Sequence, residues 1–231
     1  MTPNFEKSTH LATELLYNQD ISHRILDVRT LEYSKNIVFD SLQAYCQYTR
    51  QPIERFISEE NSLLKDSCTL YDRETNYYIV LYNDDIRIWE RKNWSIAHEI
   101  GHIYLEHTKD EEIEEVESHF FAAQLLMPEY TLYKITQEYG SIQPNYLTEI
   151  FGVSNRAAKK RIGTMKRKRS FRAMKKDKEI WDIHKEKVEI FFRCLEDGSC
   201  FRNTLNFHNL MKTEYEQLQR EEMAFQRALD F

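Results

Sequence analysis

The sequence has few of the residues that mark tight turns. Its 231 residues include only 5 Gly and 4 Pro, which disfavours a turn-rich all-β fold and favours helices. The four cysteines form no Cys-x-x-Cys pair, so a four-cysteine zinc finger is not expected. No apolar run approaches the roughly 20 residues of a membrane span, and the first ten residues have no basic-then-apolar leader. We therefore expect a cytoplasmic protein with reduced thiols and no membrane partner.

Charge is unevenly distributed along the chain. Residues 156–178 contain 12 Lys or Arg and a single acid, although the whole chain has a formal net charge of −6. Residues 110–117 contain six acids in eight positions. The overall balance excludes a uniformly basic nucleic-acid coat. Each run has two interpretations, a solvated helix face or a docking face for a partner, and the sequence leaves both open.

The periodicity of apolar residues predicts mainly helices. Tyr, Ile and Val are concentrated around a short polar turn and indicate two strands, 68–71 and 76–82, and residues 85–90 are expected to extend that sheet. A segment at 179–195 fits either a helix or a strand. The predicted helices cover 5–17, about 37–57 with a break near Pro52, 93–107 with Asn93 as N-cap, 112–127, 129–139, 144–151, 154–166 with Ser154 as N-cap, and 209–229.

Residues 98–102 read His-Glu-Ile-Gly-His. On a helix, His98 and His102 share one face, so both imidazoles can reach the same ion. Glu99 lies beside them, where a carboxylate can hold a metal-activated water without binding the metal. This is the H-E-x-x-H arrangement of zinc peptidases. A catalytic zinc takes three protein ligands and keeps one open position, so one ligand is still required.

A second helix with acids at its start is the economical source of that ligand. The acidic residues at 111–117 run directly into the apolar stretch 120–127. Small residues, Ala122 and Ala123 on this helix and Gly101 on the first, would let the two helices pack closely. The residues alone do not distinguish among the acidic candidates Glu111, Glu112, Glu114, Glu115 and Glu117.

The two motifs together resemble the ImmA/IrrE family of metallopeptidases. Ala97-His-Glu-Ile-Gly-His102 is followed by Glu115-Val-Glu-Ser-His-Phe-Phe-Ala-Ala-Gln-Leu-Leu-Met-Pro128. The family pattern is H-E-x-G-H and then E-x-E-A-N-x-F-A-A-x-L-L-M-P, and the resemblance spans about residues 68–165. It implies an α+β, zincin-like fold that is mostly helical, with a small β-sheet before the metal-binding helix. We expect the metallopeptidase domain over 1–170 and a helical or mixed region of unknown role over 171–231.

The resemblance also assigns roles to individual residues. It implies that His98, His102 and Glu115 bind the metal and that Glu99 is the catalytic base. Zn²⁺ is the expected ion, although the same ligands accept Mn²⁺ or Fe²⁺. The chain departs from the pattern at Ser118-His119, where Ala-Asn is usual. His119 is expected either to orient a ligand by a hydrogen bond or to bind the metal as a fourth ligand.

By the same resemblance, the expected activity is that of an intracellular zinc-dependent endopeptidase. Its protein substrate would be a DNA-binding transcriptional repressor of a phage or other mobile element, and an activator protein is a further expected partner. The strand at 76–82 is expected to offer its edge to an extended substrate. The alternative is a non-catalytic regulator that binds a repressor or DNA through residues 144–178, because 144–161 has the outline of a helix-turn-helix and a basic cluster follows.

Overall fold

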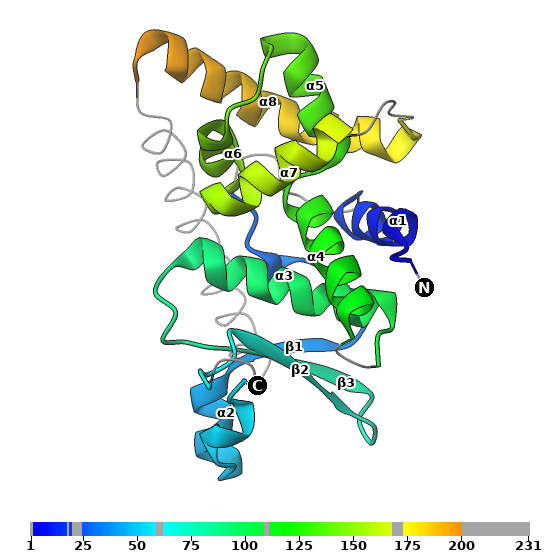
Figure 1. The fold of residues 1–231 in the computed structure, drawn as a ribbon, viewed down its shortest axis with the longest axis vertical. Helices are drawn as coiled ribbons and strands as arrows, with labels where there is room; N and C mark the ends of the chain where they lie inside the picture. The colour runs from blue at the N-terminus through cyan, green and yellow to red at the C-terminus, as the bar shows by residue number, and fades with distance from the viewer. Residues whose placement is uncertain are drawn as a thin grey trace, which may run out of the picture.

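In a computed structural model, the chain is described over residues 2–17, 19, 25–58, 62–108, 111–167 and 173–199. The predicted helix over 209–229 lies outside these residues. Helices dominate, and three strands form one small sheet, as the α+β expectation required (Figure 1). The main elements are α1 (Phe5–Tyr17), β1 (Ile37–Ser41), α2 (Leu42–Thr49), β2 (Ser67–Asp72), β3 (Tyr77–Tyr82), α3 (Trp89–Leu105), α4 (Glu112–Leu126), α5 (Glu129–Tyr139), α6 (Pro144–Phe151), α7 (Asn155–Arg167) and α8 (Lys175–Asp197).

The sheet has the strand order β1-β3-β2. β3 is central, because it pairs in parallel with β1 and antiparallel with β2. Successive side chains of a strand point to opposite faces. Val80 therefore contributes to the main core, whereas Leu81 packs with Leu42 of α2 and Phe56 in a small separate cluster. In Figure 1, α3 lies on one side of the sheet and α2 on the other.

The main core is built around the pair α3 and α4. Ile96 and Ile100 of α3 and Phe121 and Leu125 of α4 are at most 1% exposed. The two helices approach most closely at Gly101, where an added Cβ would lie 3.1 Å from both Cα and O of Ser118. This contact confirms the close packing predicted for Gly101, and it fixes the distance between the two motif-bearing helices.

Residues 37–57 differ from the predicted single helix. Ile37–Ser41 is a strand, because its β-branched and aromatic residues pair with the central strand β3 along their whole length. The helix begins only at Leu42, where the Ser41 hydroxyl accepts a hydrogen bond from the N–H of Ala44 at 3.0 Å. Periodicity over a window of twenty residues missed this change of structure at a serine cap.

The start of the metal-motif helix was also misplaced. Residues 85–90 do not extend the sheet, since α3 already begins at Trp89. Asn93 is therefore inside the helix and is not its cap. Its buried side chain accepts a hydrogen bond from the N–H of Val28 at 3.0 Å and donates one to the carbonyl of Leu26 at 2.8 Å. Asn93 thus ties α3 to the segment that precedes the sheet.

Beyond α4, the remaining described helices pack onto the same core. Residues 179–195 belong to α8, which is a helix and not a strand, and Ile180 and Val188 of α8 join the main core. The Phe192 ring stacks on Tyr139 of α5, with centroids 3.9 Å apart. A domain boundary near residue 170 stays a prediction. None of the helices over the described ranges combines the length and apolar character that crossing a membrane requires.

Gly152 offers a test of the turn between α6 and α7. It has φ +61°, and an added Cβ would lie 2.3 Å from Cγ2 of Ile25 and 2.9 Å from the ring of Trp89. Gly152→Ala should lower the free energy of unfolding by roughly 3 kcal/mol, from left-handed strain and overpacking together. Gly198 also has positive φ, but nothing lies within 4 Å of an added Cβ, so Gly198→Ala should cost only about 1 kcal/mol. Urea denaturation measures both, and equal losses would contradict the packing described.

Lys187 of α8 predicts a pH dependence of stability. Its side chain is buried, and burial lowers its pKa to about 7. In the unfolded chain a lysine keeps a pKa of about 10.4, so above pH 7 the unfolded state binds more protons than the folded state. Stability should therefore rise from pH 7.5 to 9.5 by at most about 1.4 kcal/mol per pH unit. In urea denaturation, the free energy of unfolding of Lys187→Met should rise less steeply with pH than that of the wild type. Parallel pH profiles would show that Lys187 is not the source of the pH dependence.

Candidate metal centre

Helix α3 presents both motif histidines on one face. Their Nε2 atoms lie 3.0 Å apart, and each side chain is only 12% exposed. The two residues are four positions apart, so they occupy successive turns and their rings converge on one point. His98 and His102 therefore share one face of α3 and converge on one point, as the sequence predicted.

Helix α4 brings Glu115 to the same point. Its Oε2 lies 3.2 Å from Nε2 of His98, and its Oε1 lies 3.3 Å from Nε2 of His102. Hydrogen bonds with His102 and His98 hold the pKa of Glu115 well below its usual value. The carboxylate is 40% exposed, so one side of this cluster remains open to solvent. Of the five acidic candidates, Glu115 is the one placed against both histidines.

The spacing of these three groups fits a tetrahedral ion. Zinc bonds to nitrogen and oxygen are about 2.0–2.2 Å long, and tetrahedral geometry then separates neighbouring ligand atoms by roughly 3.3–3.5 Å. The three separations here, 3.0, 3.2 and 3.3 Å, are close to that value. Two imidazoles and a carboxylate also suit Mn²⁺ and Fe²⁺. Both the donor set and its dimensions are therefore compatible with a divalent metal.

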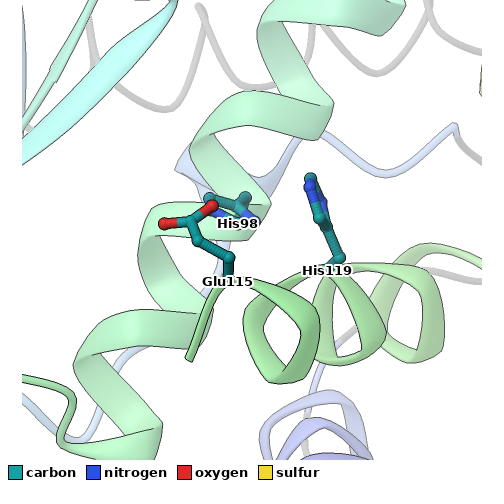
Figure 2. Close-up of side chains that lie close together, drawn as sticks. All are labelled: His98, Glu115 and His119. Carbon is teal, nitrogen blue, oxygen red and sulfur yellow. The ribbon is translucent and has the colours of Figure 1, made fainter. Parts of the chain in front are cut away.

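His119 gives a second possible ligand set. One ligating atom in each of His98, Glu115 and His119 lies within 4.8 Å of the others (Figure 2). The His119 ring centroid lies 4.4 Å from that of His98 and 6.4 Å from that of Trp94. Burial of the ring on this side, and next the charge of His98, lower the pKa of His119 to about 4, although the residue as a whole remains exposed. His98 and Glu115 are common to both sets, and the third ligand is either His102 or His119.

Glu99 points to the sheet and is held there. The Ser67 hydroxyl donates to its Oε1 at 3.0 Å, and the Thr69 hydroxyl donates to its Oε2 at 2.7 Å. Both hydroxyls come from β2, where residues two apart share a face. Sequence analysis missed Ser67 and Thr69; the available signal was a pair of hydroxyl residues at alternate positions of a strand. β2 therefore sets the orientation of the Glu99 carboxylate, one residue after His98 on α3.

His107 and Glu117 make further contacts next to the cluster. The sequence gave His107 no role and left Glu117 among the five acidic candidates for the third ligand. Nδ1 of His107 lies 3.2 Å from Nδ1 of His102 and 3.2 Å from Oγ of Ser118. Its Nε2 lies 3.0 Å from Oε2 of Glu117. The chain reverses at Glu106, which ends α3 with φ +62°, and this turn brings His107 back against its own helix. Only the proximity of a third histidine to the motif hinted at this contact.

An α+β fold in which a His-Glu-x-x-His helix lies between a small sheet and a carboxylate-bearing helix is that of a zincin-like metallopeptidase. Residues 58–163 match the family model described as peptidase M78, IrrE N-terminal-like domain. This part of the chain thus belongs to the ImmA/IrrE family of metallopeptidases, as the two motifs predicted. No curated protein matches the chain. The matched segment includes α3 and α4, which carry the candidate ligands, and β2, which holds Glu99.

The two ligand sets can be separated by metal analysis. We expect about one zinc per chain of wild-type protein, because three ligands with an open position form a catalytic site. His102→Ala should lose the metal, since Nε2 of His102 lies 3.0 Å from Nε2 of His98 and 3.3 Å from Oε1 of Glu115, whereas His119→Ala should retain it. Elemental analysis after dialysis against added zinc measures both. The reverse result, with metal kept by His102→Ala and lost by His119→Ala, would assign the site to His98, Glu115 and His119.

Proposed function

We propose that this metallopeptidase is a zinc-dependent endopeptidase, with the metal held by His98, His102 and Glu115. The observation that carries the proposal is the convergence of these three side chains at separations of 3.0 to 3.3 Å. His119, next to this cluster, is proposed to orient a ligand or the substrate. Zinc is preferred to manganese or iron because the three groups suit a four-coordinate ion with one open position.

The chemistry proposed for the chain's residues centres on Glu99. A divalent metal in this site would polarise the scissile carbonyl and lower the pKa of water. Glu99 takes the proton from the attacking water on a carboxylate oxygen and then delivers it to the leaving amine. Each carboxylate oxygen has two lone pairs, so the bonds from Ser67 and Thr69 leave acceptor capacity for that proton. The two hydroxyls fix the carboxylate in advance, which reduces the reorganisation that catalysis requires.

The edge of β2 is the proposed place for an extended substrate. The earlier expectation for residues 76–82 is wrong, because β3 pairs on both sides and has no free edge. Over the described ranges, no strand pairs with the outer edge of β2. Ser67 and Thr69 on this strand also hold Glu99. A peptide added along β2 would therefore run past the catalytic carboxylate.

The substrate class is proposed from the family resemblance. We propose a DNA-binding transcriptional repressor of a phage or mobile element, cleaved in the cytoplasm after an activator protein engages the enzyme. Regulation is required because an intracellular endopeptidase that is always active would damage its host. A repressor also offers extended segments that fit a strand edge.

Glu99→Gln tests the proposed base. The amide keeps the size of the side chain but accepts no proton, so hydrolysis should fall by about 10²- to 10⁴-fold. Metal content should not change, because Glu99 is not among the proposed ligands. Cleavage is measured on a candidate repressor by mass spectrometry. Glu90→Gln, on the same helix, is the control and should keep full activity. Cleavage by Glu99→Gln at the wild-type rate would remove Glu99 from the mechanism.

A second function is favoured by the exposed face of α7. Five basic residues are exposed along this helix, which contains no acid, and no ion pair between them and the described residues is present. Their spacing places them within about 120° of one another around a helix of 3.6 residues per turn. The residues of this basic face are Arg156, Lys159, Lys160, Lys166 and Arg167.

The opposite side of α7 is anchored to the metal-site helix. Buried Arg161 donates to the carbonyl of Met127 at 3.0 Å and to Oε1 of Gln124, and its guanidinium lies 5.6 Å from the centroid of the Phe120 ring. The basic face is therefore held rigidly and is directed outward. It supports the alternative of a regulator that binds DNA or a repressor through residues 144–178 without cleavage.

The double variant Lys159→Glu/Lys160→Glu separates the two functions. If the alternative holds, DNA binding should weaken by at least tenfold in the variant and should decrease steeply with salt in the wild type. The biological effect would then be lost in this variant and kept in Glu99→Gln. Fluorescence anisotropy with a DNA duplex measures the binding. The peptidase function predicts the opposite pattern, with the effect lost in Glu99→Gln.

A further inference from the structure

A line of polar contacts leads from the amino-terminal segment to a proposed metal ligand. The N–H of Asn4 donates to Oε1 of Glu117. The other carboxylate oxygen, Oε2, lies 3.0 Å from Nε2 of His107. Nδ1 of His107 then lies 3.2 Å from Nδ1 of His102. We call Glu117, His107 and His102 the histidine relay.

The relay is shielded from water. The His107 and Glu117 side chains are 7% and 13% exposed, and Ser118, which also contacts His107, is fully buried. In such surroundings a polar atom needs a partner within the protein, because leaving it without one costs about 1–3 kcal/mol. The positions of the protons in the relay are therefore strongly constrained.

The positions of the protons follow from the carboxylate of Glu117. An ionised carboxylate only accepts hydrogen bonds, so Nε2 of His107 must carry a proton and donate it to Glu117. With His107 uncharged, its Nδ1 has no proton and acts as an acceptor. Two groups lie 3.2 Å from this acceptor, Oγ of Ser118 and Nδ1 of His102. The Ser118 hydroxyl can rotate its proton away, whereas an unprotonated Nδ1 of His102 would place two lone pairs against each other, so we assign the donor to Nδ1 of His102. A neutral His102 protonated at Nδ1 has a lone pair on Nε2, the atom that faces Nε2 of His98 and Glu115.

We propose that Glu117 and His107 are positioning residues that hold His102 in the tautomer able to bind metal. This inference rests on the proposed metal centre, and it identifies His102, not His119, as the third ligand. The two motif histidines then differ. Nδ1 of His98 is buried and has no hydrogen-bond partner among the described residues, whereas His102 is oriented by a chain of three contacts. A hydrogen bond to the outer nitrogen of a ligating histidine fixes its ring and raises its basicity.

The relay predicts that metal binding is sensitive to substitution of Glu117. Glu117 accepts two hydrogen bonds, one on each oxygen. A glutamine has one oxygen and one NH₂ group, so it can satisfy Asn4 or His107 but not both in the same way. If the oxygen keeps the Asn4 N–H, the NH₂ group faces Nε2 of His107 and reverses its tautomer. His107 would then donate from Nδ1, and the proton of His102 would move to Nε2, where it blocks metal binding.

Two measurements test the relay on the full chain. In metal-free protein at neutral pH, long-range ¹H–¹⁵N correlation of the histidine rings should report His102 protonated at Nδ1 in the wild type and at Nε2 in Glu117→Gln. Zinc affinity, measured by competition with a chromophoric chelator, should fall by about 10- to 100-fold in Glu117→Gln. Glu112→Gln is the matched control, because it removes the same charge from an exposed position on the same helix. It should change neither quantity.

The outcomes separate this inference from the proposed function. If wild-type protein binds no zinc, the metal centre itself fails, but the ring spectra still test the relay. If zinc binds and Glu117→Gln matches Glu112→Gln in affinity, the relay is wrong while the metal centre stands. A purely structural role would lower the stability of Glu117→Gln to urea without changing the tautomer of His102. Finding His102 protonated at Nε2 in the wild type would overturn the proposal directly.

Discussion

The close approach of α3 and α4 at Gly101 is the constraint on which the site depends. The backbone of Ser118 lies where the Cβ of any other residue would project, so the two helices are separated by little more than van der Waals contact. At this separation the Glu115 carboxylate lies 3.2 Å from Nε2 of His98 and 3.3 Å from Nε2 of His102. Large apolar side chains on either side, Ile100 and Phe121 among them, stabilise the contact by burial and not by charge. A cluster of polar groups is thus held together by apolar packing.

The edge strand β2, and not the central strand β3, contributes side chains to the proposed site. β3 supplies the core, and its pairing with both neighbours makes it the rigid part of the sheet. β2, which has one partner, supplies the two hydroxyls that orient Glu99. The proposed metal ligands and the proposed base therefore depend on different elements, a helix pair and an edge strand. α3 is common to both because His98 and Glu99 are neighbours in sequence and point in different directions.

The sequence predicted the parts of this arrangement that local spacing determines. Histidines four residues apart must share a helix face. Spacing left five acidic candidates for the third ligand, and the family resemblance selected Glu115 among them. Most helices followed from periodicity, whereas the zincin-like fold class was implied by the family resemblance. Contacts that depend on chain reversals were missed: β1 is a strand because it reaches β3, and His107 meets His102 only because Glu106 adopts a left-handed conformation. The contacts of Ser67 and Thr69 with Glu99 were also missed, because they depend on which face of β2 is turned to α3.

The contact between Asn4 and Glu117 joins the segment that precedes α1 to helix α4. It is made by a main-chain N–H, and its acceptor lies 113 positions further along the sequence. A main-chain donor is the same for every residue type except proline. The side chain at position 4 caps α1 through a hydrogen bond with the N–H of Lys7, but it takes no part in the contact with Glu117. Any substitution of Asn4 other than proline therefore keeps the donor of the hydrogen bond to Glu117.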